Sequence, residues 1–250
     1  MAGHSKWASI KHKKAVVDQR RGAHFTKLAR AIQVAAREGG GDPDTNAALA
    51  LAVQKAKDAS MPKDNIERAI GKGTGAGTDA DAIETVVYEG YGPGGVAIMV
   101  EALTDNRNRT SAEVRHVFTK HGGNLGEPGS VAWQFEKKGV AVVDAERYGE
   151  DDLMPAIEAG AEDIAGDEGV WEIVTEPGDL TAVREALAAA GVEIESAEMA
   201  MRPTTRVQVD EADVGKLVRL IESLEEQDDV NAVHANFDVD ADVLERVAAA

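Results

Sequence analysis

The chain has 250 residues, 43% of them hydrophobic and 29% charged, which is enough for one large domain or two to three small ones and excludes wholesale disorder. Its formal net charge is −18 and it contains no cysteine, which excludes disulfides, thiolate metal sites and a cysteine nucleophile. The N-terminus lacks the apolar core of a secretory signal, and no apolar run approaches the ~18 residues of a membrane-spanning helix. We therefore expect a cytoplasmic protein without membrane contact.

The charge is distributed unevenly along the chain. Residues 3–37 carry nine Lys or Arg and a single acid, Asp18, whereas residues 135–250 carry 30 acids and nine bases. A cationic end on an otherwise acidic chain is typical of a segment that meets a polyanion.

Helical periodicity begins near Ala15 and ends at the glycines 39–41. One stripe of this predicted helix is apolar and comprises Phe25, Leu28, Ala29, Ile32 and Ala36. The opposite stripe is cationic and comprises Lys13, Arg20, Lys27, Arg30 and Arg37. The pattern predicts an amphipathic helix with its apolar face inward and its cationic face in the solvent.

Two more helices are expected at about 44–59 and from Pro62, as the first helical residue, to Ile70. Three helices with short connections indicate a small all-α domain. The glycine-rich stretch 71–77 that follows resembles a flexible linker.

From Glu84 onward the pattern alternates between strands and helices. Strands are expected at 85–89 and 96–102, and a capping box of Thr110 and Glu113 indicates a helix start. A half-buried strand through 131–135 should turn at 138–139 into a strand at 140–143. The remaining expected elements are helices near 150–159, 179–190 and 211–226, and strands near 170–175, 193–199, 206–209 and 230–237. The alternation predicts an α+β fold built from ferredoxin-like α/β modules.

Several stretches resemble the YebC/PmpR family, in order and over essentially the full length. They are GHSKWASIKHKKAVVDQRRG, MPKDNIERAI, YEGYGPGGVAIMVEALTDNRNRT, RHVFTKHGGNLGEPGSVAWQFEKKG and DDVNAVHANFD. The resemblance implies three domains: a helical basic domain (1–78), a middle α/β domain (79–131 and 206–250) and an acidic α/β domain (132–205) inserted into the middle one.

The resemblance also implies a role in gene expression through nucleic acid, without catalysis. Members are described as DNA-binding transcriptional regulators, mitochondrial relatives as translational activators, and bacterial members have been linked to ribosomes stalled on proline-rich stretches. DNA, structured RNA and the ribosome are thus the expected partners. This sequence departs from the family pattern at Ala23 and Gly71, where a basic residue is common, so contacts at those two positions are not expected.

The candidate nucleic-acid-binding residues are the cations and one aromatic residue of the basic end, together with two arginines of a later loop. They are Lys6, Trp7, Lys11, Lys13, Lys14, Arg20, Arg21, Lys27, Arg30, Arg37, Arg107 and Arg109. Clustered cations bind phosphates without reading sequence, and no helix-turn-helix or zinc-finger signature predicts base recognition. The alternatives are a solvated helix face, docking of Trp7 onto the helical domain, and pairing of the two loop arginines with neighbouring acids.

Other motifs do not predict chemistry. The glycine-rich stretch 122–130 is either turn geometry or a rigid contact loop, and His116 and His121 are five residues apart, off the spacing of a helical metal site. We find no phosphate loop, nucleophile elbow or acid–base pair, and expect a non-enzymatic protein without cofactor or metal, a monomer or weak homo-oligomer. A ribosome- or RNA-associated translation factor and a protein-interaction adaptor remain open alternatives.

Overall fold

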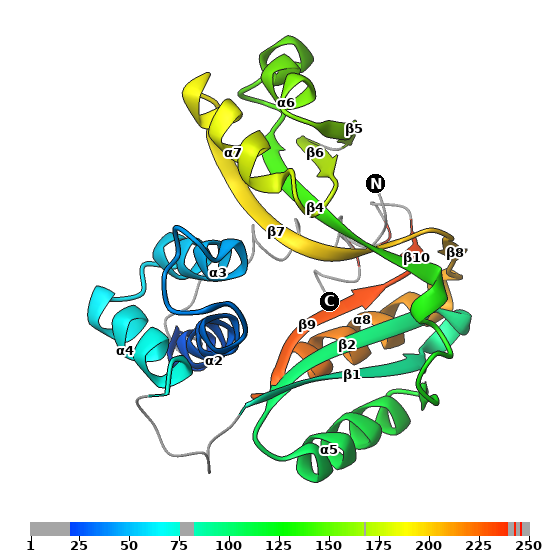
Figure 1. The fold of residues 1–250 in the computed structure, drawn as a ribbon. Helices are drawn as coiled ribbons and strands as arrows, with labels where there is room; N and C mark the ends of the chain where they lie inside the picture. The colour runs from blue at the N-terminus through cyan, green and yellow to red at the C-terminus, as the bar shows by residue number, and fades with distance from the viewer. Residues whose placement is uncertain (1–20, 76–82, 168, 240–242, 244–245, 247–250) are drawn as a thin grey trace. The chain divides into compact units, whose positions relative to one another are not determined.

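The computed structural model describes residues 21–75, 83–167, 169–239, 243 and 246, and its chain forms two compact units (Figure 1). The smaller unit is Phe135–Thr204, and the larger unit combines the described residues up to Gln134 with those from Thr205 onward. The three-domain division implied by the family resemblance stays a prediction.

The larger unit begins with three helices, as expected: α2 (Arg21–Gly39), α3 (Ala47–Asp58) and α4 (Lys63–Gly73). The predicted apolar stripe faces inward, since Leu28, Ile32 and Ala36 are buried against Leu49 of α3. Asn46 joins the helices because its Oδ1 caps Leu49 N (3.1 Å) while its Nδ2 donates to Ala35 O and Gly40 O, both at 2.8 Å.

The predicted linker at 71–77 is wrong for its first three residues, which are the last residues of α4. A Cβ on Gly73 would lie 2.4 Å from Gln33 O and 2.8 Å from Ala36 Cβ, so glycine allows α4 to approach α2 closely. Pro62 is the residue before α4 rather than its first residue. Residues 76 and 77 lie outside the described part of the chain.

A four-stranded antiparallel sheet follows in the same unit, in the order β3-β1-β2-β9. Its strands are β1 (Glu84–Tyr91), β2 (Ala97–Thr104), β3 (Asn124–Leu125) and β9 (Val230–Ala235), and a turn of 3-10 helix, η3 (Pro93–Gly95), joins β1 to β2. β8 (Val207–Gln208) and β10 (Phe237–Asp238) form a separate parallel pair.

Helices α5 (Arg107–Lys120) and α8 (Glu211–Glu225) pack against this sheet (Figure 1). Their apolar sides share one core with β2 and β9, in which Phe118, Leu217 and Ile221 are fully buried. β2 lies between two strands and is buried along nearly its whole length, so its sequence is almost continuously apolar.

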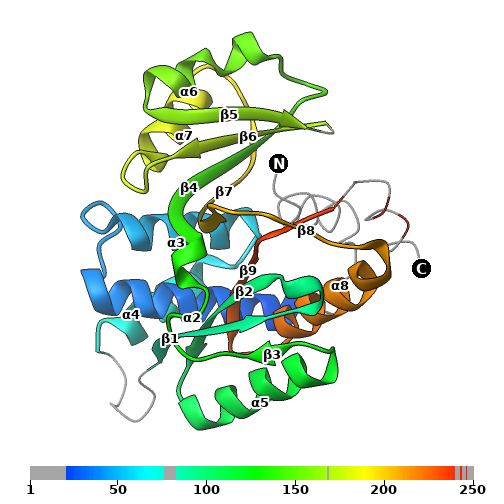
Figure 2. The same ribbon diagram turned by 90° about the vertical axis from the view of Figure 1, so that its right-hand side faces the viewer.

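The smaller unit is a second antiparallel sheet, in the order β5-β6-β4-β7. Its elements in chain order are β4 (Phe135–Asp144), η5 (Glu150–Leu153), α6 (Met154–Glu158), β5 (Ala161–Asp167), β6 (Val170–Thr175), α7 (Leu180–Ala189) and β7 (Ile194–Pro203). Helices α6 and α7 cover one face of the sheet (Figure 2), and Ala141, Val143 and Ile173 of the sheet and Leu180 and Val183 of α7 are all fully buried.

The α+β class is confirmed, but several details of the prediction are wrong. Residues 132–134 form a 3-10 turn, η4 (Ala132–Gln134), rather than a strand, and the Trp133 side chain is 70% exposed. β4 runs through residues 138–139 without a turn, and β5 was not predicted. The chain order β-α-β-β-α-β holds in the smaller unit, but in the larger unit β2 follows β1 without an intervening helix.

Candidate nucleic-acid interface

The structure describes the side chains of five of the twelve candidate residues. Six of the candidates lie outside the described part of the chain: Lys6, Trp7, Lys11, Lys13, Lys14 and Arg20. Two of these six, Lys13 and Arg20, belong to the predicted cationic stripe. Arg21 begins α2, and its side chain is not described. The candidates that can be placed are Lys27, Arg30, Arg37, Arg107 and Arg109.

The first three extend from α2 to other parts of the same unit. Lys27 Nζ donates to Glu225 O at 2.5 Å, in the last turn of α8, where helix carbonyls lack intrahelical partners and the helix dipole is negative. Arg30 donates to Asp228 O (2.8 Å), and Arg37 donates to Ile83 O. The expectation of a solvent-facing cationic stripe is therefore wrong for Lys27 and Arg30, which are partly buried.

Asp229, the residue before β9, is the centre of a hydrogen-bond network that includes Arg30. Its side chain is only 3% exposed, and its Oδ1 accepts from Arg30 at 2.7 Å. Its Oδ2 accepts from Arg109 (2.6 Å), Thr110 Oγ1 (2.7 Å) and Thr104 Oγ1 (3.1 Å). One buried carboxylate thus joins α2, the end of β2 and the first turn of α5, a network that we call the Asp229 cluster (Arg30, Thr104, Arg109, Thr110 and Asp229).

The hydrogen bonds of the Asp229 cluster decide the charge of its carboxylate. Burial disfavours the ionised form, but the hydrogen bonds from Arg109, Thr110 and Thr104 outweigh it and hold the pKa of Asp229 below its usual value. The hydrogen bond of Arg109 to Asp229 and, to a smaller extent, its hydrogen bond to Asp105 raise the pKa of Arg109. Folding therefore favours the ionised carboxylate, and the arginines beside it compensate its charge.

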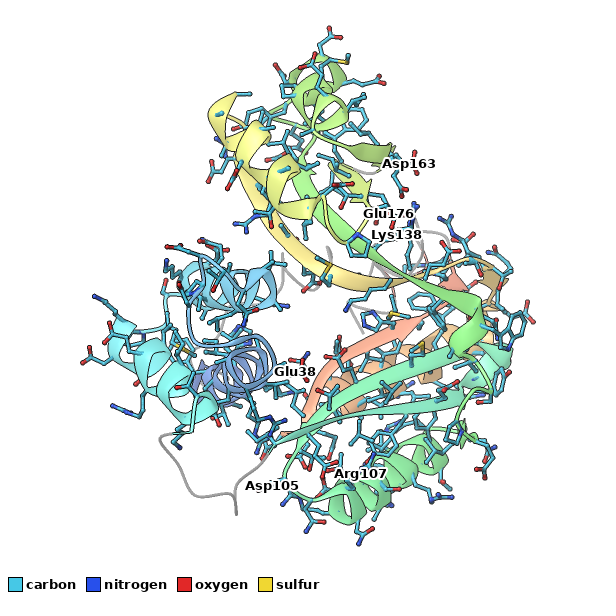
Figure 3. All side chains as sticks on the ribbon, viewed as in Figure 1. Glu38, Asp105, Arg107, Lys138, Asp163 and Glu176 are labelled. Carbon is cyan, nitrogen blue, oxygen red and sulfur yellow. The ribbon has the colours of Figure 1, made fainter. Side chains whose placement is uncertain are left out.

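The loop before α5 was expected either to hold a phosphate or to pair its arginines with nearby acids, and the structure has the second arrangement. Arg107 Nε lies 3.4 Å from Glu84 Oε2. Arg109 Nη2 lies 2.8 Å from Asp105 Oδ1 and also pairs with Asp229. Figure 3 shows Asp105 and Arg107 at the start of α5.

The helix start itself also differs from the prediction. Asn106, rather than Thr110, caps α5, since its Oδ1 accepts from Arg109 N at 3.1 Å. The predicted capping box is wrong because Thr110 lies inside the helix and its hydroxyl is bonded to Asp229.

The glycine-rich stretch 122–130 is ordered by the buried carboxylate of Glu89. That side chain accepts three backbone N–H groups, from Gly129 (2.7 Å), Val131 (2.7 Å) and Ala132 (2.8 Å). Burial alone would raise the pKa of Glu89, but these hydrogen bonds lower it. The amide groups of Gly129, Val131 and Ala132, at the end of the loop and just after it, are therefore already bonded to a carboxylate of the protein.

The cations in the second half of α5 are not among the candidate residues predicted from the sequence. Arg115, His116 and Lys120 are exposed, and within the described chain they form no ion pair. The only available signal was that acids are absent from residues 114–121. Among the described residues no group of three or more His, Asp or Glu is placed to hold a metal, and none of the described helices is long and apolar enough to cross a membrane.

Comparisons with known proteins agree over the whole chain. The model for the TACO1/YebC protein N-terminal domain matches residues 5–76, and the model for the TACO1/YebC second and third domain matches residues 83–237. A "Probable transcriptional regulatory protein" from Rubrobacter xylanophilus is 57% identical over 249 residues, covering 99% of this chain and 100% of the relative. One of the same description from Acidothermus cellulolyticus is 53% identical over 248 residues, with 99% and 100% covered.

A solved structure has the same fold. It is described as a conserved hypothetical protein, Aq1575, from Aquifex aeolicus, and it is 50% identical with a TM-score of 0.83 over 90% of this chain and 93% of that one. The domain models together cover nearly all of the sequence, and the relatives match it from end to end. The chain belongs to the TACO1/YebC family.

Proposed function

We propose that this protein is a non-enzymatic regulator of gene expression that binds nucleic acid, as a DNA-binding transcriptional regulator. The description of its relatives as probable transcriptional regulatory proteins supports the regulatory role. The binding role is supported by the charge of the chain.

The observation that carries the proposal is the basic segment 3–37, with nine Lys or Arg against one acid in a chain of net charge −18. Phosphate neutralisation with release of counterions needs clustered cations and supplies affinity without sequence recognition. The acidic remainder of the chain repels phosphate and therefore favours complexes in which this end meets the nucleic acid.

Contacts within the protein reduce the set of residues that we propose to bind nucleic acid. Lys27, Arg30 and Arg37 have partners within the protein, so we assign binding to the cations that precede them and to the aromatic residue beside them. These are Lys6, Trp7, Lys11, Lys13, Lys14, Arg20 and Arg21.

The test is a salt titration of binding to a labelled duplex DNA and to an RNA hairpin of the same length. With about five neutralised phosphates, log K should fall with log salt at a slope of roughly −4.5 on the duplex. The quadruple variant K11A/K13A/K14A/R20A should have a clearly shallower slope. A control variant, K55A/K57A/K63A/K72A, removes four lysines from α3 and α4 and should keep the wild-type slope.

Two further outcomes would favour one of the alternative functions over a DNA-binding regulator. Tighter binding of the hairpin than of the duplex at matched salt would favour a ribosome- or RNA-associated translation factor. A protein partner that is retained after nuclease treatment, together with no binding of either nucleic acid at low salt, would favour an adaptor and overturn the proposal.

A further inference from the structure

We propose that the outward face of the second half of α5 is a second binding surface for nucleic-acid phosphates. We call it the α5 basic face, and it comprises Arg115, His116 and Lys120 of α5 with Arg219 of α8. The inference rests on the proposed function, because it concerns where else on the protein the same polyanion is held.

The geometry of α5 places these groups together in the solvent. The buried residues Thr110, Val114, Val117 and Phe118 define the inward side of the helix. In both Figure 1 and Figure 2, α5 lies on the outside of the sheet of the larger unit. The opposite side of the helix is therefore open to solvent along its length.

The surface of this outward side contains a shallow, open hollow. The small side chains of Ser111, Ala112 and Thr119 line it together with the longer ones of Arg115 and His116. The hollow has a volume of about 480 Å³ and is also lined by Asn108. An extended strand can lie across such a hollow, whereas a small molecule would remain largely in contact with solvent.

These cations differ from those at the start of the same helix in having no carboxylate partner among the residues that the structure describes. Within the described chain, no ion pair involves Arg115, His116 or Lys120. Arg219 uses its Nε for the carbonyl of Gly215, at 2.9 Å, in its own helix. Glu113 is the one acid of α5, and it does not pair with them.

His121, the residue after α5, lies close enough to cations of both α5 and α8 to be affected by their charges. Its Nε2 lies 3.1 Å from Ser223 Oγ of α8, so it bridges the two helices. Burial lowers the pKa of His121, and the positive charges of Lys120, Arg219 and His116 lower it further. Groups from both helices thus act on one imidazole, and their mutual repulsion would be relieved by an anion.

The distribution of these charges favours a phosphate chain over a single anion. The cations occupy more than one turn of α5 and continue onto α8, and they do not converge on an enclosed pocket. A nucleic-acid backbone supplies repeated charges along such a surface, and each neutralised phosphate releases counterions.

The test compares the salt dependence of binding between R115A/K120A and a charge-matched control, R147A/K63A, in the full chain. All four side chains are exposed, and the control residues have carboxylate partners in Glu193 and Glu67. The probes are the duplex DNA and the RNA hairpin used for the wild type. R115A/K120A should reduce the magnitude of the slope by roughly 1.8 on duplex DNA, and less on single-stranded regions, while the control should not.

A second readout is the pKa of His121, followed by NMR in the wild type. Saturating nucleic acid should raise it, because phosphates nearby favour the imidazolium form. One set of results would overturn the α5 basic face and leave the proposed function standing. In that case the wild type binds with a salt-dependent slope, the slopes of R115A/K120A and of the control are indistinguishable, and the pKa of His121 does not change on binding. If the wild type binds neither probe, the proposed function fails, and this inference fails with it.

Discussion

The two halves of helix α5 carry cations of the same kind in opposite situations. In the first turn, Arg107 and Arg109 pair with Glu84, Asp105 and Asp229, the last of which is buried. Two turns later, Arg115 and Lys120 point into solvent without a carboxylate partner in the described chain. The first set stabilises the fold, and the second is available to an external anion.

The comparison shows that a count of lysines and arginines does not locate a binding surface. A cation that already holds a buried carboxylate cannot bind phosphate without leaving that carboxylate uncompensated, which is costly. Basic residues that lie far from an acid in the sequence can still be neutralised in the fold, as Arg30 is by Asp229, 199 residues away.

The largest effect is expected at the centre of the Asp229 cluster. The substitution Asp229→Asn removes the charge that compensates Arg30 and Arg109, and it should lower the free energy of unfolding by about 3 kcal/mol or more. Urea denaturation measures this change. The control is Asp228→Asn, an exposed neighbour whose backbone oxygen alone contacts Arg30, and it should change stability by less than about 0.5 kcal/mol. Equal effects of the two variants would remove Asp229 from its central role.

A smaller loss is expected from Glu89→Ala. The variant leaves the N–H groups of Gly129, Val131 and Ala132 without their acceptor, at a cost of about 2 kcal/mol. Hydrogen exchange of the Val131 amide should become faster. In the control variant, Glu127→Ala, an exposed acid of the same loop is removed, and exchange should not change. Unaltered protection in Glu89→Ala would mean that another contact orders the loop.

Acid should destabilise the protein through the same two carboxylates. The pKa values of Asp229 and Glu89 are both lowered by folding, so their contribution is complete above the unfolded values of about 4 and is lost as pH falls through the folded values. Each unit of lowering corresponds to about 1.4 kcal/mol. Urea titrations between pH 7 and 2 should therefore show a smaller acid-induced loss in Asp229→Asn than in the wild type. An identical pH dependence would contradict the lowered pKa of Asp229.

Much of the fold could be predicted because local patterns decide it. The apolar stripe of α8 predicted a helix at 211–226, one residue longer than observed, and the strands β1 and β2 were placed within two residues at each end. β5 was missed because its sequence, AEDIAGD, is acidic and has few apolar residues, so only its pairing with β6 stabilises it as a strand. The prediction of a linker at Gly73 is wrong because the helical role of this glycine depends on its contact with α2, which is a tertiary property.

The candidate nucleic-acid interface was predictable only in part, because the partners of its side chains are also set by tertiary contacts. The basic stripe of α2 follows from sequence, but the direction that Lys27 and Arg30 face depends on the end of α8 and on Asp229, which are distant in the chain. Thr110 was read as a helix cap because a hydroxyl followed by Glu113 fits that local motif. Its real partner, Asp229, is 119 residues away and has no local signal.

The central claim is that the cations of α5 are divided between two tasks, and one pair of substitutions tests it most directly. Arg109→Ala and Arg115→Ala remove the same side chain from the same helix, and for each variant the unfolding free energy and the salt slope of nucleic-acid binding are measured together. The account predicts that Arg109→Ala lowers the free energy of unfolding and leaves the slope unchanged. It predicts that Arg115→Ala leaves stability within about 0.5 kcal/mol of wild type and reduces the slope by about 0.9 on duplex DNA. A reduced slope in the folded Arg109→Ala variant, with no change in Arg115→Ala, would contradict it.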